Sequence, residues 1–120
     1  TGSITAEMVK YFTNTFLATK VSFANEMKML CDELNIDYDK VVEYSTYDER
    51  LGKSHWAVPG PDGKLGFGGS CFPKDLNALI DLCYEKSIKA NTLFGAWETN
   101  LEVRPEQDWK ELKGRAVVDE

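Results

Sequence analysis

The chain is predicted to be all-α, with several shorter helices and a long Gly/Pro-rich loop packed on one long central helix. About thirty residues from Thr5 to Leu34 contain neither glycine nor proline, which permits an uninterrupted helix ~45 Å long. Apolar residues farther along the chain also recur at helical spacing. The strand-like run Arg115–Val118 is followed only by two acidic residues, so it has nothing to pair with.

The long helix is the first element expected. Thr5 is its predicted N-cap, and Glu7 lies in the first turn, where an acidic side chain favours the helix dipole. A helix that is apolar on two sides needs two partners, and one of them is expected to be another subunit, which gives a homodimer. Two neighbouring apolar stripes predict this: Phe12, Phe16, Phe23, Met27, Leu30 and Leu34, and beside them Leu17, Val21, Ala24 and Cys31.

Lys10 and Asn14 lie one turn apart and continue the second stripe toward the N-terminus. Their side chains are therefore predicted to point into partly sheltered space. The alternative is that they are two ordinary exposed polar residues near the end of a helix.

A short second helix is predicted from the N-cap Asp37 to about Tyr47, closed by the segment Asp48–Gly52. The segment Lys53–Ser70 follows, and the turn chemistry of Pro59–Gly63 marks it as a loop. A loop this long inside a compact domain is usually either functional or disordered. It is predicted to be ordered and functional, because it carries the apolar side chains of His55, Trp56 and Phe67.

The most informative segment is Gly66–Asp75, which places three glycines ahead of a cysteine. Pro73 is predicted to open a third helix that reaches about Lys86, with Leu76, Leu79, Ile80 and Cys83 at helical spacing. Cys71 then lies just ahead of a helix N-terminus, where a thiol ionises more readily and is more nucleophilic. Asp75 is expected near enough for a water to bridge it to the sulfur. The pattern indicates covalent catalysis. The alternative is a common Gly-rich turn with a small core cysteine.

The fourth helix is predicted from Asn91 to Arg104, ended by Pro105, with its apolar side formed by Leu93, Ala96, Trp97 and Leu101. A short helical turn over Glu106–Lys113 follows, and Gly114 stops it. Residues 1–114 are expected to form the domain, and residues 115–120 the truncated start of another.

Composition excludes several classes of partner. The formal net charge of −6 argues against nucleic acid or an anionic membrane surface, although Arg50, Lys53, Lys64 and Lys74 flank the Gly-rich loop and could meet an anionic ligand. Three cysteines without CxxC spacing and one histidine do not make a metal site. Without a signal peptide or a long apolar run, the expected location is the cytoplasm.

Four segments of this chain resemble, in the same order, the central domain of the UDP-glucose/GDP-mannose dehydrogenase family: Ala6–Glu26, Asp48–Gly52, Val58–Gly63 and Gly66–Asp75. The resemblance extends from about Ala6 to Arg104. Within the family, the loop around Pro59–Gly63 is more similar to bacterial-type UDP-glucose 6-dehydrogenases than to the GDP-mannose enzymes.

The resemblance implies a two-step oxidation by NAD of UDP-glucose to UDP-glucuronate. Cys71 would form a thiohemiacetal and then a thioester, Asp75 would position or deprotonate water, and Lys10 and Asn14 would stabilise the oxyanion. Arg50 would reach the sugar nucleotide of the neighbouring subunit, and Lys74 would lie close to the NAD phosphates. The loop that wraps the nucleotide sugar would contribute Gly60, Asp62, Gly63, Lys64, Leu65, Gly66, Phe67 and Gly68. Cys31 and Cys83 match no catalytic position and are expected in the core.

The family also has parts that this sequence does not show. The segment Gly66–Gly69 follows no predicted strand, so it is no dinucleotide fingerprint. Relatives carry an NAD-binding domain before this region and a second nucleotide-binding domain after it, so this chain is expected to dimerise without catalysing turnover. Three alternatives stay open: a dimerisation module without chemistry, a fragment of a GDP-mannose or UDP-N-acetyl-sugar dehydrogenase, and a thiol redox switch.

Overall fold

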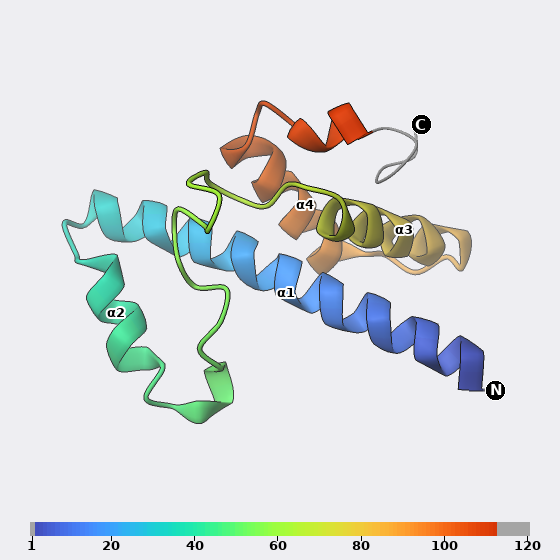
Figure 1. Ribbon diagram of the computed structural model, residues 1–120, viewed down its shortest axis with the longest axis horizontal. Coiled ribbons are helices and arrows are strands. Elements are labelled where there is room, and N and C mark those ends of the chain that lie inside the picture. The colour runs from blue at the N-terminus through green and yellow to red at the C-terminus, as the bar shows by residue number, and fades with distance from the viewer. Residues whose placement is uncertain (1, 113–120) are drawn as a thin grey trace.

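Four α-helices and two short 3₁₀ helices make up the part of the chain, residues 2–112, that the computed structural model describes (Figure 1). They are α1 (Gly2–Glu33), α2 (Tyr38–Ser45), η1 (Glu49–Leu51), α3 (Cys71–Glu85), α4 (Asn91–Val103) and η2 (Asp108–Leu112). No strand occurs among these residues, so the predicted all-α class is confirmed. The predicted stop at Gly114, the run Arg115–Val118 and the boundary after residue 114 lie outside the described residues. Of the helices in residues 2–112, none has the length and apolarity needed to cross a membrane.

The long helix α1 begins earlier than predicted. Thr5 is not its N-cap, because the chain is already helical at Gly2 and no residue between them breaks a helix. Along α1 the hydroxyl groups of Thr15 and Thr19 donate to carbonyl oxygens one turn earlier, at 2.6 and 2.7 Å. The helix ends where Asn35 adopts a φ of +58°, a conformation that asparagine tolerates well.

The other elements are arranged around α1 as a spine. In Figure 1, α3 and α4 lie on one side of α1, and α2 with η1 lies on the other, beside its C-terminal half. The larger core joins α1, α3 and α4 and contains Ala18, Phe67, Leu76, Ile80, Ala90 and Ala96. The smaller core joins α1, α2 and the loop and contains Ala24, Cys31, Tyr38 and Val58. Cys31 is therefore a core residue, as predicted, and Cys83 packs against the larger core.

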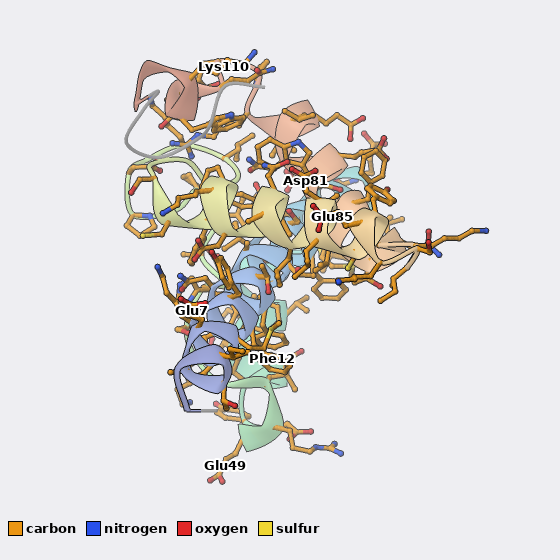
Figure 2. All side chains as sticks on the ribbon, turned by 90° about the vertical axis from the view of Figure 1, so that its right-hand side faces the viewer. Glu7, Phe12, Glu49, Asp81, Glu85 and Lys110 are labelled. Carbon is orange, nitrogen blue, oxygen red and sulfur yellow. The ribbon has the colours of Figure 1, made fainter. Side chains whose placement is uncertain are left out.

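The two apolar stripes of α1 have different surroundings. Ala24 and Cys31 of the second stripe are buried by this chain. The first stripe stays largely exposed: Phe12 is 70% and Phe16 is 60% exposed, and Phe23, Leu30 and Leu34 are exposed as well. Figure 2 shows Phe12 on the N-terminal half of α1, away from α3. Within the described residues, the second stripe of α1 is thus covered by this chain, whereas most of the first stripe is not.

Candidate active site

Cys71 is the first residue of α3, and Ser70 occupies the N-cap position before it. The prediction that Pro73 opens this helix is therefore wrong by two residues. The first turn closes earlier because the Lys74 amide reaches the Ser70 carbonyl oxygen at 3.3 Å, and Pro73 fits there because a first-turn residue needs no amide hydrogen. The Cys71 side chain is exposed at this helix end, with its Sγ 3.9 Å from the Ser70 Oγ.

Asp75 lies one turn after Cys71, on the same face of α3, and is buried. Asn14 of α1 donates from Nδ2 to Asp75 Oδ2 at 2.7 Å. This bond joins two helices whose residues are far apart in sequence, and it fixes the carboxylate at the seam between α1 and α3. The structure thus brings Cys71, Asp75 and Asn14 to one place.

Lys10 lies one turn before Asn14 and is exposed, so for Lys10 the alternative of an exposed polar residue near a helix end holds, and the sheltered position does not. Asn14 is half-buried, as predicted. The difference arises because α1 diverges from α3 toward its N-terminus, as both views show (Figures 1 and 2). The Lys10 ammonium lies 5.9 Å from the centroid of the Tyr11 ring.

Arg50 belongs to the turn η1, which Asp48 caps by accepting from the Arg50 amide at 3.0 Å. The guanidinium is exposed and pairs with Asp48 Oδ2 at 2.6 Å. Lys20 anchors this turn, since its Nζ donates to the Leu51 carbonyl oxygen at 2.9 Å and lies 4.6 Å from the Trp56 ring centroid. Burial lowers the pKa of Lys20. Within one chain, η1 lies across α1 from α3, so the structure does not bring Arg50 to Cys71 (Figure 1).

The loop with the predicted substrate-binding residues has an exposed tip and a buried stem. At the tip, the Gly60 amide donates to the Lys64 carbonyl oxygen at 2.9 Å, and the Gly63 amide donates to the Gly60 carbonyl oxygen at 2.9 Å. Asp62, Gly63, Lys64 and Leu65 are exposed there, whereas Gly66 and Phe67 of the stem are buried and Gly68 is half-buried. Lys74 is exposed on the first turn of α3.

Arg104 ties the loop tip to the end of α4, and the sequence pattern did not predict this role. Its side chain is 2% exposed and donates to Asp62 Oδ2 at 2.6 Å, Leu65 O at 3.0 Å and Asp108 Oδ1 at 2.8 Å. The hydrogen bond from Arg104 lowers the pKa of Asp62. Burial opposes the ionisation of Asp108, but hydrogen bonds from Arg104 and the Gly69 amide outweigh it and lower its pKa as well. The sequence feature that could have indicated this ion pair is the four-residue spacing of Arg104 and Asp108.

Two buried asparagines hold the stem of the loop, and the sequence pattern did not predict them either. Asn25 of α1 accepts a hydrogen bond from the Gly66 amide at 3.1 Å. Asn100 of α4 accepts one from the Phe67 amide at 2.7 Å. Nothing in helical periodicity marks a polar residue that faces a loop rather than solvent.

Two kinds of cofactor site, a metal cluster and a dinucleotide-binding turn, do not occur among the described residues. No group of three His, Cys, Asp or Glu side chains within residues 2–112 could hold a metal ion. In the same part of the chain no strand precedes Gly66–Gly69, so this segment lacks the strand–turn–helix setting of a dinucleotide-binding turn. The ammonium of Lys74 is exposed on the first turn of α3, where it could contact an anionic group such as a phosphate.

The chain is similar to known proteins over most of its length. A model of the UDP-glucose/GDP-mannose dehydrogenase family, central domain, matches residues 4–102. The chain is 37% identical over 99 residues to UDP-glucose 6-dehydrogenase TuaD of Bacillus subtilis, which covers 82% of this chain and 20% of that protein. It is 35% identical over 119 residues to UDP-glucose 6-dehydrogenase AglM of Haloferax volcanii, and this match covers 99% of this chain and 26% of that protein.

A solved structure is similar to this chain as well. A UDP-glucose dehydrogenase from the hyperthermophilic archaeon Pyrobaculum islandicum matches with a TM-score of 0.73 and 38% identity, over 81% of this chain and 21% of that chain. The chain spans about a fifth to a quarter of the length of these three proteins.

Proposed function

The chain belongs to the UDP-glucose/GDP-mannose dehydrogenase family as its central domain, and we propose that it carries the catalytic cysteine of an NAD-dependent UDP-glucose 6-dehydrogenase. The observation that carries the proposal is the exposed Cys71 in the first turn of α3, with Asp75 one turn behind it and held by Asn14. The relatives named UDP-glucose 6-dehydrogenase favour UDP-glucose as the substrate. GDP-mannose or a UDP-N-acetyl sugar is the alternative within the family.

The proposed reaction converts a primary alcohol of the sugar into a carboxylate in two oxidations. The chemistry that NAD supplies, when bound by another part of the enzyme, is hydride acceptance. Once the alcohol has become an aldehyde, the Cys71 thiolate adds to the carbonyl carbon and forms a thiohemiacetal. Loss of a second hydride leaves a thioester. Water then adds to the thioester carbon, the C–S bond breaks, and the uronate leaves while the thiolate is regenerated.

The residues near Cys71 fit the other needs of this chemistry. The Asp75 carboxylate, fixed by Asn14, is proposed to hold or deprotonate the water that hydrolyses the thioester. Lys10 lies on the same face of α1 as Asn14, and its exposed ammonium is proposed to reach the oxyanion that forms on the former carbonyl oxygen.

Residues farther from the sulfur are proposed to bind the nucleotide parts. The turn η1, which carries Arg50, lies across α1 from α3, and this suits contact of Arg50 with a sugar nucleotide on a neighbouring subunit (Figure 1). The loop from Gly60 to Gly68 is proposed to wrap the substrate, and the exposed Lys74 to meet an NAD phosphate.

We further propose that residues 1–114 form the central domain and that NAD is held mainly by a part of the enzyme outside this chain. The pure chain, supplied with UDP-glucose and NAD, is expected to produce no NADH above a protein-free control. Measurable NADH production would contradict this part of the proposal.

The exposed stripe of α1 is proposed to pair with a second copy of the chain. Phe12 and Phe16 remain mostly in water within one chain, and large apolar side chains of this kind are usually covered. The double variant Phe12→Glu/Phe16→Glu is expected to sediment as a monomer, whereas Tyr84→Glu, an exposed aromatic residue on α3, keeps the dimer. A wild-type chain that sediments as a monomer at all concentrations would refute the pairing.

Alkylation of Cys71 tests the catalytic role against a module without chemistry. Exposure alone makes Cys71 more accessible than Cys31 or Cys83, so the matched reference is Cys71→Ser/Glu85→Cys, with the thiol exposed at the far end of the same helix (Figure 2). With iodoacetamide at neutral pH, Cys71 is expected to react at least about threefold faster than the reference, because the helix dipole favours the thiolate only at the N-terminal end. Equal rates would favour the module.

A further inference from the structure

We propose that Asn100, together with Asn25, is a positioning residue for Cys71. The two asparagines fix the backbone at Gly66–Phe67, and the aromatic packing of Phe67 carries that constraint to the first turn of α3. This inference rests on the proposed function, because it assumes that the placement of the Cys71 thiol matters.

Asn100 holds the backbone of one residue at two points. Its Oδ1 accepts from the Phe67 amide at 2.7 Å, and its Nδ2 donates to the Phe67 carbonyl oxygen at 3.0 Å. Asn100 is fully buried. Both ends of its side-chain amide are therefore matched to one peptide segment, and the match requires a donor and an acceptor on the same short side chain.

Asn25 binds the backbone of Gly66, the residue before Phe67, from a different helix, α1. Its Oδ1 accepts from the Gly66 amide at 3.1 Å, while its Nδ2 donates to the Val21 carbonyl oxygen at 2.9 Å. Asn25 is buried on α1 and Asn100 on α4, so consecutive residues of the loop are tied to two different helices. The loop stem cannot follow one helix without breaking its bond to the other.

The glycine at position 66 makes this approach possible. Gly66 has a φ of +68°, and a Cβ built there would collide with Asn100 Oδ1 and touch Val103. A side chain at this position would push Asn100 away from Phe67. Gly66 is therefore needed for the close approach of Asn100, besides the close approach of a ligand that the sequence predicts.

The constraint reaches the cysteine through aromatic rings. The Phe67 ring is buried and lies edge-on to the ring of Phe72, with centroids 5.9 Å apart and planes at 76°. Phe72 directly follows Cys71 in the first turn of α3. A shift of Phe67 therefore moves a neighbour of the nucleophile without any direct contact between Asn100 and the sulfur.

Amide protection in the wild-type chain gives a first test that needs no variant. The Gly66 and Phe67 amides are expected to exchange as slowly as amides in the middle of α3, because buried asparagine oxygens hold them. Exchange at the rate of the exposed tip at Gly63 would overturn the clamp.

Substitution tests the effect on Cys71. Asn100→Asp keeps the shape and the acceptor but turns the donor that faces the Phe67 carbonyl oxygen into a second acceptor. With the variant shown by circular dichroism to be folded, its Cys71 is expected to be alkylated about threefold more slowly than in the wild type. Gly66→Ala is expected to act in the same direction, and Asn91→Asp, an exposed change at the start of α4, is expected to have no effect.

The outcomes separate the two proposals. If Asn100→Asp and Gly66→Ala lower the melting temperature but leave the alkylation rate of the folded state unchanged, the two residues are only structural and the inference is wrong. If wild-type Cys71 reacts no faster than the Glu85→Cys reference, the proposed catalytic role fails first.

Discussion

Replacing Arg104 by methionine tests whether the loop tip is anchored by a buried cation. Methionine keeps much of the aliphatic stem and its packing but removes the guanidinium. The change deletes the hydrogen bonds to Asp62, Leu65 and Asp108, two of which join the loop tip to the end of α4.

The expected loss of stability follows from how deeply the Arg104 cation and its partner carboxylates are buried. Removing one partner of a fully buried ion pair costs roughly 3–5 kcal/mol, because the other charge is left without compensation. Here the carboxylates are better solvated than the cation, since the Asp62 side chain is 48% and the Asp108 side chain 28% exposed. The free energy of unfolding is therefore expected to fall by about 2–3 kcal/mol.

Urea unfolding followed by tryptophan fluorescence measures this loss. Trp109 is buried and packs against Trp97 with ring centroids 5.0 Å apart, so the fluorescence reports on the region around Arg104. For a chain of this size the urea dependence is about 1–1.5 kcal/mol/M, so the midpoint should fall by ~2 M. Wild type and variant are compared at one protein concentration, because pairing of two chains would also stabilise the fold.

Arg50→Met is the matched control. Arg50 also pairs with a carboxylate at 2.6 Å, but its side chain is 88% exposed, whereas that of Arg104 is 2% exposed. Pairs in water contribute little, so the control should leave the midpoint unchanged. If the two variants shift the midpoint equally, burial of the cation is not what stabilises the loop, and the reasoning fails.

Three further predictions concern titration and charge. Arg104 keeps the pKa values of Asp62 and Asp108 low in the folded state, so their stabilising effect is complete above about pH 5 and is lost as the pH falls below about 4, through the lowered pKa values. Acid unfolding curves of Arg104→Met should lack this slope. Burial raises the pKa of Tyr38 to about 12, so phenolate absorbance should include a tyrosine that ionises only near pH 12, and the free energy of unfolding should decline as the pH rises from about 10 toward 12. Tyr38→Phe should lower the free energy of unfolding by about 1 kcal/mol, because it removes the hydrogen bond to the Trp56 carbonyl oxygen. Asn14→Asp would set a second carboxylate against Asp75, and its melting temperature should rise as the pH is lowered from 7 to 5 and the repulsion is neutralised. Asn14→Ala removes the donor without adding a charge, so its rise should be smaller.

Helices and their boundaries could be predicted where local chemistry decides them. Asp37 is an example, because its carboxylate accepts from the amides of Asp39 and Lys40. At Thr5 and Pro73 the local signals were equally good, but the helices start earlier. A capping residue offers a hydrogen bond without forbidding the turn before it, so the remaining chain decides where a helix begins.

The contacts that hold the loop could not be predicted from one sequence. Asn100 bonds to Phe67 and Arg104 bonds to Leu65 across separations of 33 and 39 residues. A hydrophobic period predicts which face of a helix is buried, but it gives no partner for a single polar side chain on that face. The family motifs led to Cys71 and Asp75, whereas the side chains that support the loop leading to them became visible only in three dimensions.

The polar side chains around the site divide according to whether their partners lie within the chain. Asp75 and Asn100 are buried and bonded to other elements, so binding a ligand there would first require breaking internal bonds. Cys71 and Lys10 end in solvent, where a ligand only has to replace water, and the exposed Arg50 pairs only with the nearby exposed Asp48. When buried groups are already fixed around exposed reactive side chains, less conformational entropy is lost as the substrate binds and reacts. Substitutions in the buried set should therefore change stability and the placement of the thiol together, whereas substitutions in the exposed set should change reactivity or binding while the unfolding midpoint stays the same.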